Sequence, residues 1–157
     1  MQQIHFMVKN RRYTLAEQIY TLKGMYKGSR STQLSPSSFC WFMDVQPLPL
    51  SDTYTLKILY AASMAWPKVF ITKPFPLKLA DGATVLPHCY DTKKQQLCLF
   101  YPKYREWDDT MLIAKTIVHW AIMWIIYYET WVISGKWLGG GHGDWDAPKS
   151  ATTNHDD

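Results

Sequence analysis

Cys98 is the residue of this sequence with the clearest capacity for chemistry. It stands between Leu97 and Leu99, ten residues after His88 and nine residues before Trp107. A free thiol has a pKa of about 8.5, so a minor thiolate fraction exists at neutral pH, and the thiolate is strongly nucleophilic. Such a sulfur can accept an acyl group as a thioester, which an amine then attacks. A lone cysteine between apolar residues is also often a small, buried and unreactive side chain. The surrounding sequence must therefore distinguish a reactive Cys98 from a buried one.

The other two cysteines, Cys40 and Cys89, indicate neither a disulfide framework nor a metal site. Three cysteines cannot all pair within one chain, and residues 1–13 contain no apolar signal-peptide core, so we expect a cytoplasmic protein with free thiols. Cys40 lies in an aromatic segment and is expected in the core. Cys89 adjoins His88, but together with Cys98 these residues offer three ligands without a CxxC pair, whereas a structural zinc ion needs four. We therefore expect no metal.

The elements that must position Cys98 are those of a mixed domain. Residues 14–28 show the apolar spacing of a helix, opened by the capping pair Thr14 and Glu17. Three apolar stretches separated by short loops predict strands, at residues 39–47, 54–62 and 68–74. Residues 75–96 have an irregular pattern, and residues 106–131 predict one long helix or two consecutive helices. This order predicts an α+β fold with an N-terminal helix, an antiparallel β-meander and C-terminal helices.

The C-terminal helical region is apolar without being a membrane span. Its strongest apolar run, residues 116–128, contains 13 residues and includes His119. A spanning helix needs roughly 20 apolar residues, so we expect a buried helix and no membrane partner. Asp108 or Asp109 is expected to cap the start of this helical region, where a carboxylate also suits the helix dipole.

Length and charge limit the organisation of the chain. The 157 residues fit one domain, which we assign to residues 1–141, with residues 142–157 as a flexible C-terminal tail. There is no repeat and no Gly-rich phosphate loop, so no cofactor is expected.

The charge of the chain is unevenly distributed. Within the net charge of +4, residues 1–40 hold six cationic side chains against one carboxylate. That bias is compatible with a nucleic acid, an anionic membrane or an acidic protein surface as partner, and equally with a solvated helix face.

The motifs around Cys98 resemble those of the ubiquitin-conjugating enzyme family. In that family the histidine of a His-Pro-Asn motif lies ten residues before the catalytic cysteine, as His88 does here, and the cysteine stands in an Ile-Cys-Leu setting, here LCL. A tryptophan and a helix follow eight or nine residues later, as Trp107 does. The sequence AWPKVFI at residues 65–71 is similar to the Lys-Pro-Pro-Lys-Val entry of a family strand. The similarity spans roughly residues 14–130.

Within this family, the chain is most similar to a bacterial branch found in antiphage operons. Members of this branch have LPH, LCL, YP and EW in the order seen between residues 86 and 107, followed by a Trp-rich helix. Their sequences then end in a motif similar to GKWLGGG, here at residues 135–141. The branch includes the E2-only type of the CBASS defence systems, which use cyclic-nucleotide signals.

The resemblance implies a UBC-like fold and identifies candidate site residues. Cys98 matches the catalytic cysteine, and His88 matches a histidine that is more often structural than acid–base. The family asparagine, usually credited with supporting the oxyanion or the active-site loop, has no counterpart, because Cys89 and Tyr90 follow His88. A phenol can donate a hydrogen bond, so Tyr90 is the candidate substitute.

The resemblance also implies a function and partners. The chain would be an E2-like transferase that forms a thioester between Cys98 and the C-terminal carboxylate of a partner protein, a cyclic-nucleotide synthase of the same operon. It would pass that carboxyl group to an amine, in antiviral defence. ATP-dependent activation would come from a separate activating enzyme, nucleic acid would not be a partner, and a homodimer stays open. Because the family asparagine is missing, a catalytically silent UBC-like adaptor is the alternative.

Overall fold

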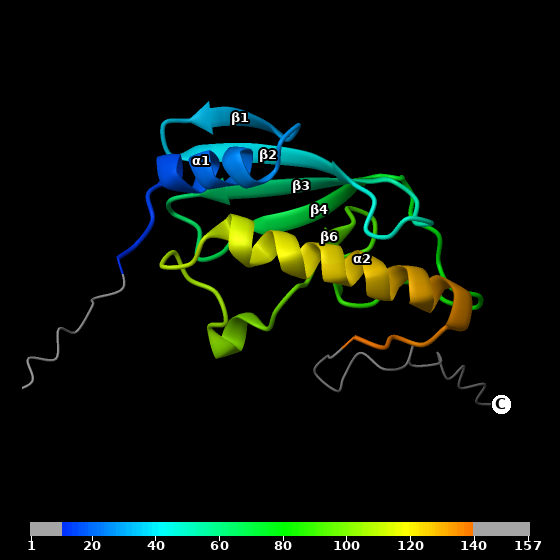
Figure 1. Cartoon of the computed structure of the whole chain (residues 1–157). Helices are drawn as coiled ribbons and strands as arrows, with labels where there is room; N and C mark the ends of the chain where they lie inside the picture. The colour runs from blue at the N-terminus through cyan, green and yellow to red at the C-terminus, as the bar shows by residue number, and fades with distance from the viewer. Residues whose placement is uncertain (1–10, 140–157) are drawn as a thin grey trace, which may run out of the picture.

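The computed structural model describes residues 11–139 and shows two α-helices lying against one antiparallel sheet (Figure 1). The elements follow the chain in the order α1 (Leu15–Met25), β1 (Arg30–Ser35), β2 (Ser38–Val45), β3 (Tyr54–Ala61), β4 (Lys68–Lys73), β5 (Cys89–Asp91), β6 (Gln96–Leu97) and α2 (Ile117–Ser134). Short 3-10 helices at Pro102–Tyr104 and Ile113–Lys115 precede α2. The predicted mixed fold, in which one helix precedes and another follows the strands of an antiparallel sheet along the chain, is confirmed. The predicted tail, residues 142–157, lies outside the described residues.

The sheet supplies the frame on which the Cys98 segment is held. Its strand order is β1-β2-β3-β4-β6-β5, and every neighbouring pair is antiparallel. The three predicted strands are confirmed as β2, β3 and β4, a meander whose members neighbour each other in sequence and in space. On α2, the side chains buried against the rest of the core are Ile117, Val118, Ala121, Trp124, Ile125, Tyr128 and Trp131. These side chains recur at helical spacing, which places a single apolar face toward the sheet.

The predicted helix near the start of the chain is confirmed as α1. Its capping box is complete, because the Glu17 amide donates to the Thr14 hydroxyl and the Thr14 amide donates to the Glu17 carboxylate, each at 3.2 Å. One polar side chain ties α1 to the residues before α2. Fully buried Gln18 donates to the Met111 carbonyl oxygen and accepts from the Ile113 amide, both at 2.9 Å. The start of the C-terminal helical region is therefore fixed by α1.

Two features of the elements differ from the sequence-based expectation. β1 was not predicted, because its residues are polar and mostly exposed, as suits an edge strand that packs little apolar surface. The predicted cap at Asp108 or Asp109 is wrong: the Asp108 carboxylate accepts from the Thr110 amide at 2.8 Å in a turn, and α2 begins only at Ile117. Short polar side chains favour such local turns as readily as helix caps.

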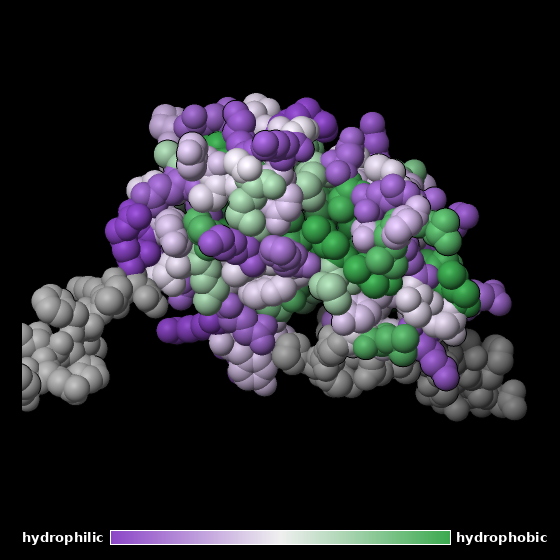
Figure 2. Space-filling view, in the orientation of Figure 1, coloured by the Kyte–Doolittle hydropathy of each residue, from purple (hydrophilic) through white to green (hydrophobic). Residues whose placement is uncertain are grey.

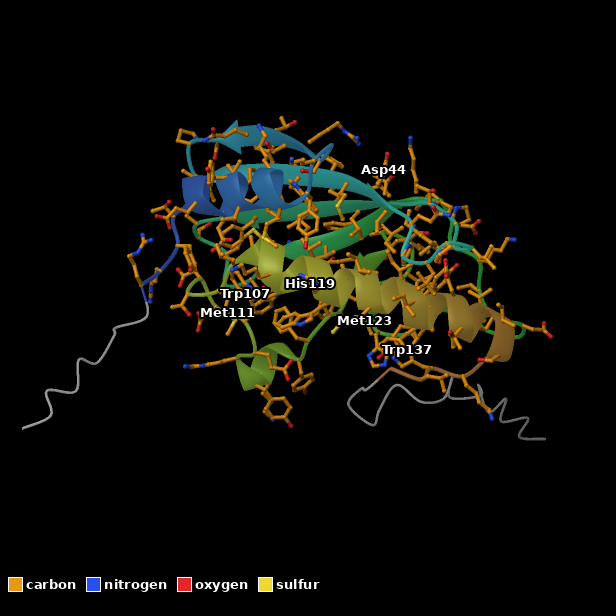
Figure 3. All side chains as sticks on the ribbon, viewed as in Figure 1. Asp44, Trp107, Met111, His119, Met123 and Trp137 are labelled. Atoms are coloured by element: carbon orange, nitrogen blue, oxygen red, sulfur yellow. The ribbon has the colours of Figure 1, made fainter. Side chains whose placement is uncertain are left out.

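Trp107 packs near the start of α2, where Figure 3 labels it beside Met111. Its ring is buried and lies edge-on to Tyr60 at 5.7 Å, and its indole N–H donates to the Thr116 hydroxyl at 3.1 Å. Thr116 is the residue preceding α2. The tryptophan nine residues after Cys98 therefore anchors the helix start to the sheet.

Apolar side chains gather on the face shown in Figure 2, above α2 and toward its C-terminal end. Large apolar side chains that are exposed include Leu48 and Leu50, in the loop between β2 and β3, and Ile133, near the end of α2. Within residues 11–139, no helix combines the length and apolar character that crossing a membrane requires.

Candidate functional site

A short β-hairpin places His88 and Cys98 opposite each other. β5 and β6 pair antiparallel, with Cys89 facing Leu97. Next to this pair, the Cys98 amide donates to the His88 carbonyl oxygen at 2.9 Å. The ten-residue spacing seen in the sequence therefore has a structural cause. His88 and Cys98 are neighbours across the two arms of one hairpin, and the chain between them forms the rest of the arms and the turn.

The turn of this hairpin is anchored to the sheet by Gln95, which is 1% exposed. Its side-chain oxygen accepts from the Leu77 amide at 2.7 Å, and its side-chain nitrogen donates to the carbonyl oxygens of Ile71 at 2.8 Å and Pro74 at 3.0 Å. Buried backbone groups need such partners, and here one side chain supplies three of them. Gln95 itself has a φ of +53°, in the left-handed region. The hairpin is therefore fixed relative to β4.

His88 occupies the structural centre of the segment. The residue is buried, and its φ of +45° lies in the left-handed region, which non-glycine residues seldom adopt. Its carbonyl oxygen accepts two hydrogen bonds, from the Cys98 amide at 2.9 Å and from the Trp124 indole at 3.1 Å. Its ring stacks on Trp137, with centroids 4.9 Å apart and planes at 28°. These contacts favour a structural role for His88.

Cys98 is the most accessible of the three thiols. Cys40 and Cys89 are each 6% exposed, whereas Cys98 is half-buried. Burial raises the pKa of the Cys89 thiol to about 12, and that thiol donates to the Gln96 carbonyl oxygen at 2.9 Å. Side chains alternate between the two faces of a strand, so Leu97 points into the core and Cys98 points outward. A reagent in solvent can therefore reach Cys98 more readily than Cys89.

Tyr90 lies on the same outer face of the hairpin and acts on the Cys98 thiol. Burial raises the pKa of Cys98, and the nearby Tyr90 hydroxyl opposes that rise. The hydrogen bond that the thiol itself makes is to the Phe100 carbonyl oxygen, at 3.3 Å. The Glu106 carboxylate raises the pKa further by like-charge repulsion of the thiolate. Tyr90 is 48% exposed, and its own pKa is raised by burial and then by its contact with Cys98. The phenol is thus placed to stabilise negative charge on or near the sulfur.

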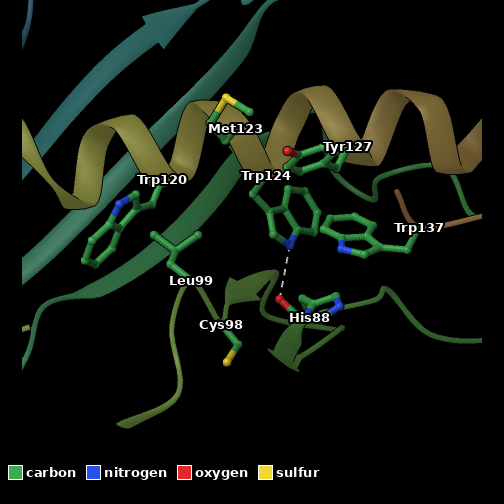
Figure 4. A pocket seen from close by; sticks show the side chains of 8 residues that line it. All are labelled: His88, Cys98, Leu99, Trp120, Met123, Trp124, Tyr127 and Trp137. Atoms are coloured by element: carbon green, nitrogen blue, oxygen red, sulfur yellow. Dashed lines mark hydrogen bonds between the residues drawn. The ribbon is translucent and has the colours of Figure 1, made fainter. Parts of the chain in front are cut away.

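An aromatic hollow of about 160 Å³ lies between this segment and α2. The residues that line it are His88, Cys98, Leu99, Trp120, Met123, Trp124, Tyr127 and Trp137. Figure 4 shows the Cys98 sulfur pointing away from the tryptophans. The hollow therefore borders the Cys98 backbone, whereas the thiol itself faces the Tyr90 side.

The segment after α2 folds back to close this hollow. Gly135 ends the helix with a φ of +72°, and Trp137 then packs against His88, Trp124 and Tyr127, with ring centroids 4.9 to 5.8 Å apart. At Gly139 a Cβ would lie 2.6 Å from Tyr127 Cδ2, so only glycine fits against that ring. Gly140, Gly141 and the residues that follow lie outside the described residues.

The structure brings all three predicted site residues, Cys98, His88 and Tyr90, onto one hairpin. Sequence reasoning missed Trp124 and Trp137. Trp124 lies in the apolar run that predicted a buried helix, and it is buried, but nothing in that run reveals that its N–H donates to the His88 carbonyl oxygen. Among residues 11–139, no three His, Cys, Asp or Glu side chains gather in a group that could hold a metal ion.

Comparison with known protein families identifies the chain's relatives. A family model described as "Type II CBASS E2 protein" matches residues 18–144, which include the hairpin, α2 and the GKWLGGG motif. No curated protein sequence matches the chain significantly.

Proposed function

Since the chain belongs to the type II CBASS E2 family, we propose that it is a transferase in which Cys98 carries a partner protein's C-terminal carboxyl group as a thioester. Family membership itself implies a protein partner within the CBASS system. The specific donor that we propose is the cyclic-nucleotide synthase of that system, acting in antiviral defence. The acceptor is an amine, on a lysine side chain or on a small molecule.

The proposed chemistry has two acyl transfers. First, the Cys98 sulfur attacks the carbonyl carbon of an activated C-terminus, a thioester or acyl-adenylate made by a separate activating enzyme. The new C–S bond forms, the bond to the leaving group breaks, and the thiol proton passes to solvent. Second, the amine nitrogen attacks the Cys98 thioester, forming a C–N bond while the C–S bond breaks. The nitrogen loses a proton to solvent and the leaving thiolate takes one up. Because a thiolate leaves readily, positioning and oxyanion stabilisation dominate the barrier.

The single observation that carries this proposal is the placement of Cys98. It is the most accessible of the three thiols, on the outer face of a fixed hairpin, with a phenol donor beside its sulfur. The Tyr90 hydroxyl can donate to a developing negative charge, the role that the missing asparagine would otherwise serve. The arrangement of α1, the meander, the Cys98 segment and α2 within residues 11–139 supports a UBC-like fold for the domain that we assign to residues 1–141.

The test is to incubate the full chain with its operon synthase and activating machinery and to look for a covalent adduct. We expect an adduct that thiol reductants remove, an adduct resistant to reductant with Cys98→Ser, and none with Cys98→Ala. Cys89→Ala is the matched control and should still form the adduct. An adduct that persists in Cys98→Ala, or full antiphage activity of that variant, would contradict the proposal.

A second candidate is a catalytically silent adaptor with the same fold. Two observations favour it: the family asparagine has no counterpart, and burial raises the pKa of Cys98. Alkylation with iodoacetamide at pH 7.5 separates the two candidates. Because Cys40 is buried in either case, the informative comparison is with an exposed thiol of ordinary pKa such as glutathione: a transferase predicts a Cys98 rate near or above that of glutathione, and an adaptor predicts a much slower rate.

A further inference from the structure

We propose that Trp124 is a positioning residue for Cys98, acting through the carbonyl oxygen of His88. That Cys98 reacts rests on the proposed function. That Trp124 positions Cys98 rests on geometry alone. The Trp124 indole N–H and the Cys98 amide N–H converge on one oxygen atom, at 3.1 Å and 2.9 Å. A carbonyl oxygen has two lone pairs, so both donors are satisfied together.

Trp124 can serve as a fixed point because its own position is set by packing. It is 3% exposed, and its ring stacks on Tyr128 with centroids 5.3 Å apart and planes at 6°. The Tyr128 hydroxyl in turn donates to the Lys78 carbonyl oxygen at 2.8 Å. The indole N–H therefore projects from the longest helix of the described chain at an orientation that neighbouring side chains determine.

The Cys98 segment needs such a fixed point. β6 has only two residues, and so short a ladder provides little stability by itself. His88 holds a left-handed φ of +45°, a conformation that persists only where the surroundings impose it. The Trp124 hydrogen bond fixes the orientation of the peptide group that follows His88, and that peptide group receives the Cys98 amide. Trp124 thus determines where the Cys98 backbone lies relative to α2.

Trp120 offers a matched control on the same helix. It lines the same hollow and packs on Phe100, with ring centroids 5.8 Å apart. Among residues 11–139, its indole makes no hydrogen bond to the hairpin, so replacing it removes aromatic bulk without removing a donor. Trp124→Phe and Trp120→Phe therefore lose the same atoms and differ in the hydrogen bond.

The test follows amide hydrogen exchange in the full chain by NMR. In Trp124→Phe we expect the Cys98 amide to exchange about fivefold faster than in the wild type, the change that loss of a hydrogen bond of typical strength produces. The amides of Leu56 and Ile58 in β3 report global opening and are used to correct for it. We expect the Cys98 amide of Trp120→Phe to stay within twofold of the wild type.

Alkylation supplies a second readout of the same displacement. Because burial is the main cause of the raised pKa of Cys98, loosening its segment should lower the midpoint of the pH–alkylation curve for iodoacetamide. Buried Cys89 should stay protected, which separates a local change from unfolding.

The proposal is overturned if, after correction, the Cys98 amide of Trp124→Phe exchanges within twofold of the wild type, or if Trp120→Phe accelerates it equally. Trp124→Leu, which also lacks a donor, is used if Trp124→Phe does not fold. Neither readout involves the donor protein. A chain that never forms the reducible adduct would therefore refute the proposed function, while the exchange result would still decide the role of Trp124.

Discussion

At the scale of single residues, opposing influences meet at the Cys98 sulfur. Burial and the Glu106 carboxylate favour the neutral thiol, whereas the Tyr90 hydroxyl favours the thiolate. The balance leaves the pKa of Cys98 above its ordinary value. The thiolate fraction therefore increases with pH through the alkaline range, and any reaction that starts from free Cys98 should accelerate there.

Removing the Tyr90 hydroxyl should shift that balance. We expect Tyr90→Phe to raise the pKa of Cys98 further and to slow its alkylation at pH 7.5 by about three- to tenfold, since about 1.4 kcal/mol corresponds to one pKa unit. The measurement is the rate of iodoacetamide labelling of Cys98 by mass spectrometry, as a function of pH. Tyr20→Phe is the control, because Tyr20 is 79% exposed on α1. Unchanged labelling in Tyr90→Phe would mean that the phenol does not stabilise the thiolate.

The Cys89 thiol should make stability depend on pH. Its pKa in the folded protein is about 12, above the ordinary value of a thiol, so between about pH 9 and pH 12 the folded state holds a proton that the unfolded state has lost. The free energy of unfolding should therefore fall as pH rises, by up to about 1.4 kcal/mol per pH unit from this group. Urea denaturation of the wild type and of Cys89→Val checks this, with a smaller decline expected in the variant. Identical declines between pH 9 and pH 10 would contradict the assignment.

The sequence could identify these residues only in part. Cys98 drew attention as a free thiol, whereas His88 and Tyr90 became candidates through the resemblance to the ubiquitin-conjugating enzyme family. The hairpin accounts for the ten-residue spacing between His88 and Cys98. The distinction between buried Cys89 and half-buried Cys98 depends on which face of the ladder each occupies, and neither residue's neighbours reveal it. The role of the Trp124 N–H depends on a contact across 36 residues of sequence.

At the scale of elements, the hairpin depends on its attachment to β4 through Gln95. The pairing between β4 and β6 is short: Phe70 faces Gln96, and the Ile71 amide donates to the Gln95 carbonyl oxygen at 3.1 Å. Gln95 adds three hydrogen bonds to buried backbone groups. Sequence reasoning placed this region outside regular structure, because neither β5 nor β6 is long enough to show an alternating pattern.

Replacing Gln95 should therefore destabilise the protein strongly. Gln95→Leu leaves the Leu77 amide and two carbonyl oxygens buried without partners, and each unsatisfied group costs about 1–3 kcal/mol. We expect the free energy of unfolding in urea to fall by about 3 kcal/mol or more. Gln96→Leu is the matched control, since among residues 11–139 the Gln96 side chain makes no hydrogen bond. Equal losses in the two variants would show that the amide contacts contribute little.

At the scale of the whole molecule, the residues after α2 return to the hairpin. Trp137 stacks on His88, and Gly139 lies against Tyr127, so the end of the described chain contacts the segment that carries Cys98. The sequence predicted the order of the helices and the central strands correctly, because their apolar patterns are long. It could not show this return, since a Gly-rich ending has no period that indicates what it packs against.

A methyl group at Gly139 should disturb this packing. Gly139→Ala places a Cβ 2.6 Å from Tyr127 Cδ2 and 2.8 Å from Trp137 Nε1, so the segment must shift. We expect a loss of about 1–3 kcal/mol in the free energy of unfolding, together with changed NMR shifts of the Trp137 indole. In Gly24→Ala, where a Cβ would meet nothing within 4 Å, stability should be unchanged or slightly higher. Similar behaviour of the two variants would contradict close packing at Gly139.

The hairpin also constrains how this segment can vary in length. Along a strand, adding or deleting one residue exchanges the inner and outer faces for everything beyond it. One extra residue between Asp91 and Gln96 that slipped the pairing would turn the Cys98 sulfur toward the core and leave Leu97 in water. Substitutions along the hairpin arms should be tolerated far better than a single insertion, so the number of residues in this loop is itself a condition for keeping the thiol at the surface.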